Sequence, residues 1–210
     1  MGSYEDIIIR IILVTVAAYL VGSIPTGVLV SRIVNADPLS AGSRKTGTTN
    51  VYRVAGPGAM IVVAIGDICK GVVAGLAARF LVPENALFWA IIGFAAIFGH
   101  VWSVFLKFRG GRGVATAAGL ALTLFPVTSA IAVGIGLLLI IFTRIASIGS
   151  LSGAAIFVGA QAILVPSLSF DLLAVALFLF LFISHRDNIV RLIHGKELRM
   201  TRIQSSNSNR

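Results

Sequence analysis

The sequence predicts an all-α, polytopic membrane protein with seven transmembrane helices, its N-terminus outside the cell and its C-terminus in the cytoplasm. Hydrophobic residues make up 57% of the 210 residues and charged residues only 12%, and the mean hydropathy is +0.98. A soluble domain of this length has too small an interior to bury so many apolar side chains. The apolar residues occur in long runs rather than in the alternating pattern of a membrane β-barrel, which favours helices that cross the bilayer.

The apolar runs divide into seven expected helices. The first run follows acidic residues and lacks a basic start and a small-residue cleavage site, so we interpret it as a retained span rather than a signal peptide. The fourth and fifth runs are short for about 30 Å of hydrocarbon, so either they form one bent element or the fourth lies within the protein at an angle. The expected helices cover residues 7–22 (with a continuation past Pro25 towards 34 left open), 58–82, 86–106, 113–125, 126–142, 149–165 and 170–184.

The chain is expected to form one integral membrane domain over residues 1–200, followed by a flexible tail at 201–210. No repeat, low-complexity segment or linker divides it. Most of the 17 Lys and Arg fall in alternate connections and in the tail, the exceptions being Arg10, Lys70 and Arg79. The positive-inside rule places this basic face in the cytoplasm. The net charge of +9 is therefore expected to meet lipid headgroups rather than nucleic acid.

The first polar segment, residues 41–53 with the sequence AGSRKTGTTNVYR, is an expected loop that carries Arg44, Lys45 and Arg53 and contains no Asp or Glu. Its glycines let the backbone turn closely around a ligand with N–H groups exposed, and its hydroxyls and cations suit a phosphate. The alternative is a basic loop that only orients the protein and touches anionic lipid. Charge alone would serve that purpose without the closely spaced Gly, Ser, Thr and Asn residues.

The second polar segment, residues 107–114 with the sequence KFRGGRGV, leads directly into the fourth expected helix. Free N–H groups at a helix start, with Arg112 beside them, make an anion site. The spacing is not that of a Walker A motif. A tight turn between two spans is the alternative, and this segment alone leaves both interpretations open.

The third polar segment, residues 184–197 with the sequence SHRDNIVRLIHGKE, ends the apolar part of the chain. His185, Asn188 and Arg191 fall at spacings of three and so share one face of a helix that continues the seventh span. A His at the end of a span is more often structural than catalytic. Its place beside Asn188, on the same face as two other anion-suited segments, favours a role as phosphate donor or proton acceptor.

Two further features lie within the spans. Asp67 and Lys70 are three residues apart in the second expected helix, where a structural ion pair is favoured over a functional one. His100, low in the third expected helix, is placed to line the same cleft as the polar segments. The single cysteine, Cys69, excludes an internal disulfide. The few candidate metal ligands are dispersed, so we expect neither a metal nor a cofactor.

Six short motifs follow one another in order over residues 22–197. They are GSIP at 22–25, the segment 42–53, DICKG at 67–71, GH at 99–100, GGRGVAT at 110–116 and HRDNIVRLIHGKE at 185–197. In this order they resemble the bacterial acyl-phosphate-dependent glycerol-3-phosphate acyltransferases of the inner membrane. The resemblance covers nearly the whole chain, and it is the order of the motifs, more than any one of them, that makes it specific.

The resemblance implies a reaction and its setting. A fatty acyl group would pass from acyl phosphate to the 1-hydroxyl of sn-glycerol 3-phosphate, giving lysophosphatidic acid and inorganic phosphate as the first committed step of phospholipid synthesis. The implied partners are these two substrates, membrane lipid and the enzyme that produces acyl phosphate. The implied location is the bacterial inner membrane, with the active site on the cytoplasmic face. No Ser-His-Asp or Cys-His arrangement argues for an acyl-enzyme.

The predicted site draws on all three polar segments. Ser43, Arg53, His185 and Asn188 are expected to bind glycerol phosphate, while Thr49 and the turn at 110–112 are expected to hold the acyl phosphate and the departing phosphate. The general base is His185 or a phosphate oxygen of the substrate. The catalytic residues are predicted as His185, Arg53 and Asn188, and the substrate-binding residues as Ser43, Lys45, Gly47, Thr49, Asn50, Gly110, Gly111, Arg112, Gly113, Arg191 and Glu197.

The chain departs from the family pattern at three positions. Arg44 and Lys45 stand where the family usually has Gly-Asn, and Arg112 stands where it usually has Lys. Arg112 keeps the charge but replaces a compact ammonium with a planar fork.

Two other functions are open at this stage. A transporter or channel for a phosphorylated metabolite is disfavoured, because no inverted repeat is present and the polar motifs are all predicted on one face. An acyltransferase that uses acyl-CoA or acyl carrier protein would be supported by an HxxxxD motif, but Phe105 and Val190 stand at the Asp positions after His100 and His185.

Overall fold

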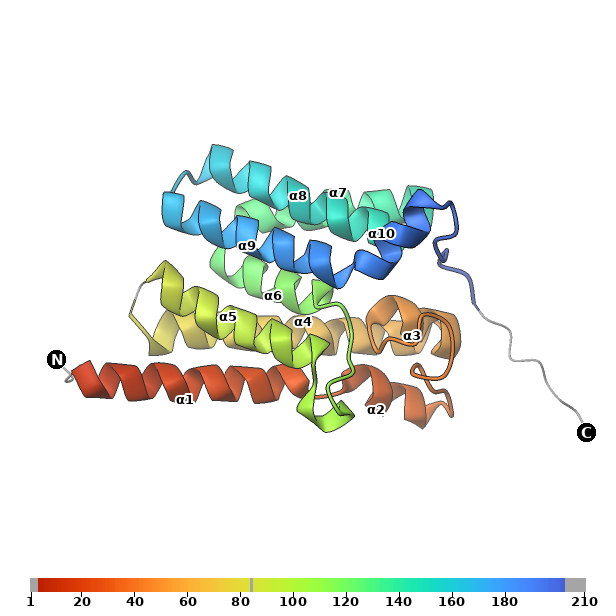
Figure 1. The fold of residues 1–210 in the computed structure, drawn as a ribbon, viewed down its shortest axis with the longest axis horizontal. Helices are drawn as coiled ribbons and strands as arrows, with labels where there is room; N and C mark the ends of the chain where they lie inside the picture. Colours follow the sequence, from red (N-terminus) through yellow and green to blue (C-terminus); the bar gives the residue numbers. More distant parts are fainter. Residues whose placement is uncertain (1–3, 84, 203–210) are drawn as a thin grey trace, which may run out of the picture.

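The computed structural model describes residues 4–83 and 85–202, and over these residues all regular structure is helical. The helices lie side by side in one bundle, with α1 starting at one end and the segment after α10 leaving from the other (Figure 1). In chain order they are α1 (Tyr4–Ser23), α2 (Thr26–Ile33), α3 (Thr48–Ala55), α4 (Pro57–Leu81), α5 (Ala86–Val101), the 3₁₀ turn η1 (Val104–Leu106), α6 (Val114–Leu124), α7 (Pro126–Thr143), α8 (Ala146–Leu164), α9 (Leu168–Ser184) and α10 (Arg186–Ile193). The predicted flexible tail lies outside the described residues from 203 onwards.

All seven expected apolar runs form helices, but not all are long enough to be spans. Within the described chain, five helical stretches are long and apolar enough to cross a membrane, or six if α9 and α10 form one bent span. The fourth expected helix, α6, has 11 residues and rises only ~16 Å. That is about half the hydrocarbon thickness, and α6 packs against α4, α5 and α7 inside the bundle. Seven crossings with the stated orientation stay a prediction.

Proline determines where several helices begin. α1 and α2 are separated at Pro25, and together they form a stretch of 30 residues. Pro57 and Pro126 stand at the first turns of α4 and α7, where a missing backbone N–H leaves no hydrogen bond unmade. Gly56, just before α4, has a φ of 89° that only glycine adopts at low cost.

Small residues bring the helices into close contact around the site. A Cβ on Gly22 of α1 would overlap the carbonyl oxygen of Ala96 in α5, and a Cβ on Gly71 of α4 would overlap that of Thr116 in α6. Such close approach lets backbones pack without a large apolar driving force inside the bilayer. A buried apolar cluster that includes Ile97, Leu120 and Leu177 joins the helices from α5 to α9.

Two expectations about the polar segments are wrong in detail. Residues 41–53 are not one loop, because α3 begins at Thr48 after Gly47 and buries Asn50, Val51 and Arg53. The third polar segment does not continue the last span straight, because α9 and α10 meet at His185 with a bend of 65°. The carbonyl of Leu181 accepts bonds from the side chain of Ser184 and from the backbone of His185, which ends α9 there.

The three polar segments nevertheless meet at one end of the bundle, where α2, α3 and α10 lie in Figure 1. The hydroxyl of Ser184 donates to the carbonyl of Arg112 at 3.0 Å, which joins the second segment to the third. A Cβ on Gly47 would come within 3.9 Å of the Cα of Gly111, which places the first segment beside the second. The fold thus assembles one polar site from segments far apart in the sequence.

Candidate active site

Asn50 organises the loop between α2 and α3. Its Oδ1 accepts from the backbone N–H of Ser43 at 2.8 Å. Its Nδ2 donates to the carbonyls of Pro38, Ala41 and Lys45 at 2.8, 3.1 and 2.9 Å. Because the buried amide is fully engaged with the backbone, Asn50 fixes the shape of this loop from within.

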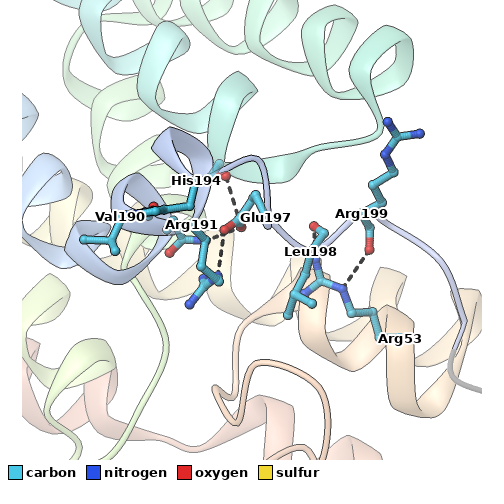
Figure 2. Close-up of polar contacts among 9 residues, drawn as sticks. Arg53, Val190, Arg191, His194, Glu197, Leu198 and Arg199 are labelled. Atoms are coloured by element: carbon cyan, nitrogen blue, oxygen red, sulfur yellow. Dashed lines mark hydrogen bonds and ion pairs between the residues drawn. The ribbon is translucent and has the colours of Figure 1, made fainter.

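Arg53 ties α3 to the segment that follows α10. In Figure 2 its guanidinium reaches the carbonyls of Leu198 and Arg199, with Nη2 and Nε donating at 2.8 and 3.0 Å. Arg53 is buried, and burial lowers its pKa, an effect that nearby Glu197 opposes and Arg191 strengthens. The side chain lines the site, and it also holds the C-terminal segment against α3 at the edge of the site.

Glu197 is the centre of the polar contacts around α10. Its Oε2 accepts from Nε of Arg191 at 2.8 Å, as drawn in Figure 2. Its Oε1 accepts from Nδ2 of Asn188 at 2.6 Å and from the hydroxyl of Ser147 at 3.2 Å. This carboxylate therefore joins α8, α10 and the C-terminal segment, and it fixes the amide of Asn188 with Oδ1 turned away from it.

His185 lies between α9 and α10 and is only 3% exposed. Its Nδ1 is 2.8 Å from the carbonyl of Leu181, and because a carbonyl only accepts, Nδ1 carries the proton in the neutral ring. Burial lowers the pKa of His185 to about 4; the Leu181 bond opposes this and nearby Arg112 adds to it. At neutral pH the ring is uncharged, and Nε2 is left as an acceptor.

Two cations face the site without a carboxylate of their own. Arg112 and Lys45 form no ion pair within the described residues. Burial and then the charge of Arg191 lower the pKa of Arg112 to about 10, while burial and then the charge of Arg112 lower the pKa of Lys45. Cations that are partly buried and close to one another are stabilised by a bound anion.

The turn that carries Arg112 rests on His100. The N–H of Gly111 donates to the carbonyl of His100 at 3.1 Å, and a Cβ on Gly111 would overlap the imidazole. Nδ1 of His100 faces Oδ1 of Asp67 at 3.5 Å. Asp67 pairs with Lys70 at 2.7 Å and Thr26 hydrogen-bonds both residues, so the expected ion pair is confirmed. Asp67 also lines the cavity described below, and a structural rather than functional role for the pair stays a prediction.

A cavity of about 470 Å³ connects these groups with the interior of the bundle. One end is polar, and its lining includes Ser43, Lys45, Arg53, Arg112, His185 and Asn188. The other end runs between α6, α7, α8 and α9 and is apolar, with Ala121, Val133, Phe157 and Leu177 in its wall. The volume lies within the ~300–1,000 Å³ of typical small-molecule sites. An amphiphile with an anionic head fits this division.

Four buried polar atoms in the cavity wall have no hydrogen-bond partner among the described residues: Oγ of Ser43, Oδ2 of Asp67, Oγ of Ser129 and Oδ1 of Asn188. Two of them, Oγ of Ser43 and Oδ1 of Asn188, lie at its polar end. Buried polar groups are usually paired, so these two are available to a ligand. Since Glu197 holds the Asn188 amide with its nitrogen as donor, Oδ1 can only accept, which suits a ligand hydroxyl better than a phosphate oxygen.

The sequence of the chain matches one known protein family over most of its length. A family model described as glycerol-3-phosphate acyltransferase matches residues 12–195. The chain belongs to the glycerol-3-phosphate acyltransferase family. A relative from Lactiplantibacillus plantarum, named glycerol-3-phosphate acyltransferase, is 39% identical over 189 residues, which are 90% of this chain and 91% of the relative. A relative of the same name from Synechococcus elongatus is 38% identical over 208 residues, covering 95% and 99% of the two chains.

Two solved structures share the fold of this acyltransferase family member. Both are crystal structures of PlsY (YgiH), described as an integral membrane glycerol 3-phosphate acyltransferase, one in its glycerol 3-phosphate form and one in its lysophosphatidic acid form. They match with TM-scores of 0.83 and 0.82 at 27% identity, over 90% of this chain and 94% of theirs. The match supports a multi-pass membrane protein.

The structure separates the predicted site residues of this family member into two groups. The cavity wall contains Ser43, Lys45, Gly47, Thr49, Asn50, Arg53, Arg112, Gly113, His185, Asn188 and Glu197. Gly110, Gly111 and Arg191 are outside the lining of this cavity, so their predicted contact with substrate has no support from it. Gly111 and Arg191 instead hydrogen-bond His100 and Glu197, which lie in its wall.

Sequence reasoning missed four polar residues that line the cavity, Thr48, Ser129, Ser147 and Ser150. Thr48 begins α3, and its place within the first polar segment was the available signal. Ser147 lies near the start of an apolar helix, where the sequence carries no polar segment, and only its bond to Glu197 marks it.

Proposed function

We propose that this chain transfers a fatty acyl group from an acyl phosphate to the 1-hydroxyl of sn-glycerol 3-phosphate. The products are lysophosphatidic acid and inorganic phosphate. Family membership supports the glycerol 3-phosphate acyltransferase activity. The solved forms of PlsY with glycerol 3-phosphate and lysophosphatidic acid support the acceptor and the product.

The shape and charge of the cavity carry the proposal for the donor. Both substrates bear a phosphate, and the polar end offers Lys45, Arg53 and Arg112 without an opposing free carboxylate. The apolar end accommodates an acyl chain next to these cations. Acyl phosphate is a mixed anhydride with a good leaving group, so direct transfer needs no nucleophile from the protein.

In the proposed step the O1 oxygen of glycerol 3-phosphate attacks the acyl carbonyl carbon. The new C–O ester bond forms as the carbonyl carbon–oxygen bond to phosphate breaks, and the hydroxyl proton leaves with the departing phosphate or passes to a base. Arg112 stabilises the charge that grows on the leaving phosphate, and its position in the lining of the cavity supports this role. Oδ1 of Asn188 accepts from a hydroxyl of the glycerol.

His185 orients the acceptor hydroxyl in this proposal rather than holding its proton. Its Nε2 is a free acceptor because Nδ1 is engaged by Leu181. With a pKa of about 4 the ring is a weak base at neutral pH, whereas an effective general base has a pKa near the working pH. A phosphate oxygen of the acyl phosphate, whose charge rises as the anhydride bond breaks, is the better proton acceptor.

The setting is proposed together with the reaction. We infer that the site opens to the cytoplasm at the inner membrane, since the end of the bundle that holds it also holds most of the exposed Lys and Arg of the connections. An enzyme that produces acyl phosphate is the implied partner, because the donor hydrolyses and partitions into the membrane.

The decisive experiment is an assay of purified protein with acyl phosphate and glycerol 3-phosphate. We expect lysophosphatidic acid and phosphate in equal amounts. Arg112→Ala should lower the rate about 10²-fold by removing charge stabilisation, and Arg32→Ala, an exposed Arg outside the cavity, is the matched control. Acylation with acyl-CoA alone would refute the donor, and uptake of labelled glycerol 3-phosphate into vesicles without a donor would favour transport.

A further inference from the structure

A second pocket of about 530 Å³ adjoins the first, and we name it the outer basic pocket. It is formed by the loop that precedes α3 and by the turn that precedes α6. Its lining consists of Leu39, Ser40, Arg44, Lys45, Arg109 and Gly110. Arg44 and Arg109 are exposed, so the pocket is open to solvent, while Lys45 is half-buried at its inner side. Of these residues, the proposed reaction uses only Lys45, which also lines the inner cavity.

The charge of the outer basic pocket is uncompensated. Its lining has three cations and no carboxylate. Arg44, Lys45 and Arg109 form no ion pair within residues 4–83 and 85–202. Three unpaired cations around one concave surface concentrate a positive potential, which attracts and holds an anion.

The backbone that presents these cations is in an unfavourable conformation at several points. Arg44 has a φ of 54°, and Lys107 and Phe108, just before Arg109, have φ values of 52° and 61°. Glycine adopts this left-handed region at least cost, whereas an Arg at position 44 adds strain and places a long cation at the pocket. Strained residues of this kind concentrate at functional sites, and here two separate segments carry them to the same pocket.

Lys45 belongs to both the outer basic pocket and the inner cavity. A phosphate held by Arg44 and Arg109 is therefore separated from the reaction site by one flexible side chain. The inner cations, Arg112 and Arg53, lie beyond it in the cavity wall. The two pockets form a continuous positive path from solvent to the polar end of the cavity.

We propose that the outer basic pocket is a second phosphate-docking site, which holds the phosphate group of a ligand before it passes Lys45 into the inner cavity or after it leaves. The ligand has two sources: a free phosphate ester in solution, or the phosphate of a lipid headgroup at the membrane surface, which the exposed Phe108 beside Arg109 would contact. Only the identity of the passing ligand rests on the proposed function.

The test compares two Arg→Gly variants in the same type of backbone. Arg44→Gly removes a cation from the pocket and relieves the left-handed strain, so loss of function cannot be assigned to misfolding. Arg144→Gly is the matched control, since Arg144 is also exposed, has a φ of 56° and lines neither pocket. Arg109→Gln removes the second cation without a backbone change.

We expect Arg44→Gly and Arg109→Gln to raise the KM for glycerol 3-phosphate about fivefold in neutral detergent, with kcat unchanged and with a weaker dependence of kcat/KM on salt. Binding of inorganic phosphate, followed by ³¹P line broadening, should lose its weaker phase in the same two variants. Arg144→Gly should match the wild type in all of these measurements. Because phosphate binding is measured without turnover, this result stands even if the wild type makes no lysophosphatidic acid.

Nanodiscs with and without phosphatidylglycerol distinguish the two sources. If the site holds a lipid phosphate, native mass spectrometry of protein released from anionic nanodiscs shows more retained phosphatidylglycerol on the wild type than on Arg44→Gly, and KM in detergent is the same for both. If it holds a free ester, the KM and line-broadening effects appear and the nanodisc difference does not. Wild-type behaviour of Arg44→Gly and Arg109→Gln in all three measurements would overturn the proposal.

Discussion

Two regions of the cavity wall treat their polar groups in opposite ways. Around Glu197, the carboxylate pairs with Nε of Arg191 and Nδ2 of Asn188, although Nη2 of Arg191 and Oδ1 of Asn188 have no partner among the described residues. On the α2–α3 loop and the turn before α6, the hydroxyl of Ser43 and the cations Lys45 and Arg112 are left without a side-chain partner among the described residues. The first region builds the site, and the second is free to bind a ligand. A polar residue that belongs to a motif therefore does not necessarily contact the substrate.

The largest effect is expected at the centre of the paired region. Glu197→Ala leaves Arg191 and Asn188 without their acceptor inside the protein; because the Arg191 side chain is 30% exposed, losing the ion pair and the Asn188 bond together costs about 3 kcal/mol rather than more. Thermal unfolding in detergent should show the loss, and turnover should fall with it. Glu197→Gln, which keeps the shape and one acceptor oxygen, should recover part of both; equal stability of the alanine variant and the wild type would contradict the comparison.

Asn50 lies in the α2–α3 loop, which offers groups to a ligand. We nevertheless expect its substitution to lower the stability of the fold, as substitution of Glu197 does. Asn50→Asp preserves the size of the side chain but turns three carbonyl acceptors towards a carboxylate, which costs about 2–3 kcal/mol. We expect a lower unfolding temperature and a faster proteolytic cut within residues 38–47. Asn85→Asp, at the helix cap of α5, is a matched control that keeps its role as acceptor.

His185 belongs to both regions, since Nδ1 is paired and Nε2 is free. Its pKa is about 4 in the folded protein, below the 6.5 of an unperturbed His, so the unfolded chain binds more protons between these values. Stability is then complete above pH 6.5 and declines as the pH falls towards 4, by up to about 3 kcal/mol. Unfolding curves from pH 8 to 4 measure this.

The same pKa predicts a turnover rate with no inflection near pH 6.5. His185→Gln should flatten the pH dependence of stability. An inflection of kcat near 6.5 that disappears in His185→Gln would show instead that the His is a general base in its ordinary range.

The smallest effect on stability is expected at Ser43. Its hydroxyl has no partner to lose, so Ser43→Ala should change the free energy of unfolding by less than about 0.5 kcal/mol. It should raise the KM for glycerol 3-phosphate about tenfold if a charge-assisted bond to the ligand is lost. A large loss of stability with unchanged KM would show that the Ser43 hydroxyl stabilises the fold, as the groups around Glu197 do, and does not bind the ligand.

Most of the fold could be predicted because apolar length is a local property. The runs at 58–82 and 126–142 differ from α4 and α7 by one residue at their ends. What local patterns missed were the places where side-chain bonds decide the backbone. The bend at His185 depends on bonds to the carbonyl of Leu181, and the start of α3 depends on burying Asn50 and Arg53 against other segments.

The candidate site, like the fold, could be predicted from the sequence for the most part. The three polar segments contain most of the cavity's polar wall, because each combines cations with small polar residues. Their pattern did not tell ligand contacts from supports, and it missed Ser147, whose neighbours in sequence are apolar.

By itself the sequence determined a helical membrane protein of the glycerol-3-phosphate acyltransferase family, with three polar segments suited to phosphate. These properties follow from hydropathy and from residue types at short spacing. Only the tertiary structure decided which atoms remain free, since that depends on partners distant in the chain: Leu198 for Arg53, Glu197 for Asn188 and His100 for the turn at Gly111. Buried polar atoms are usually paired, so those left unpaired at the polar end of the cavity, Oγ of Ser43 and Oδ1 of Asn188, are available to a ligand.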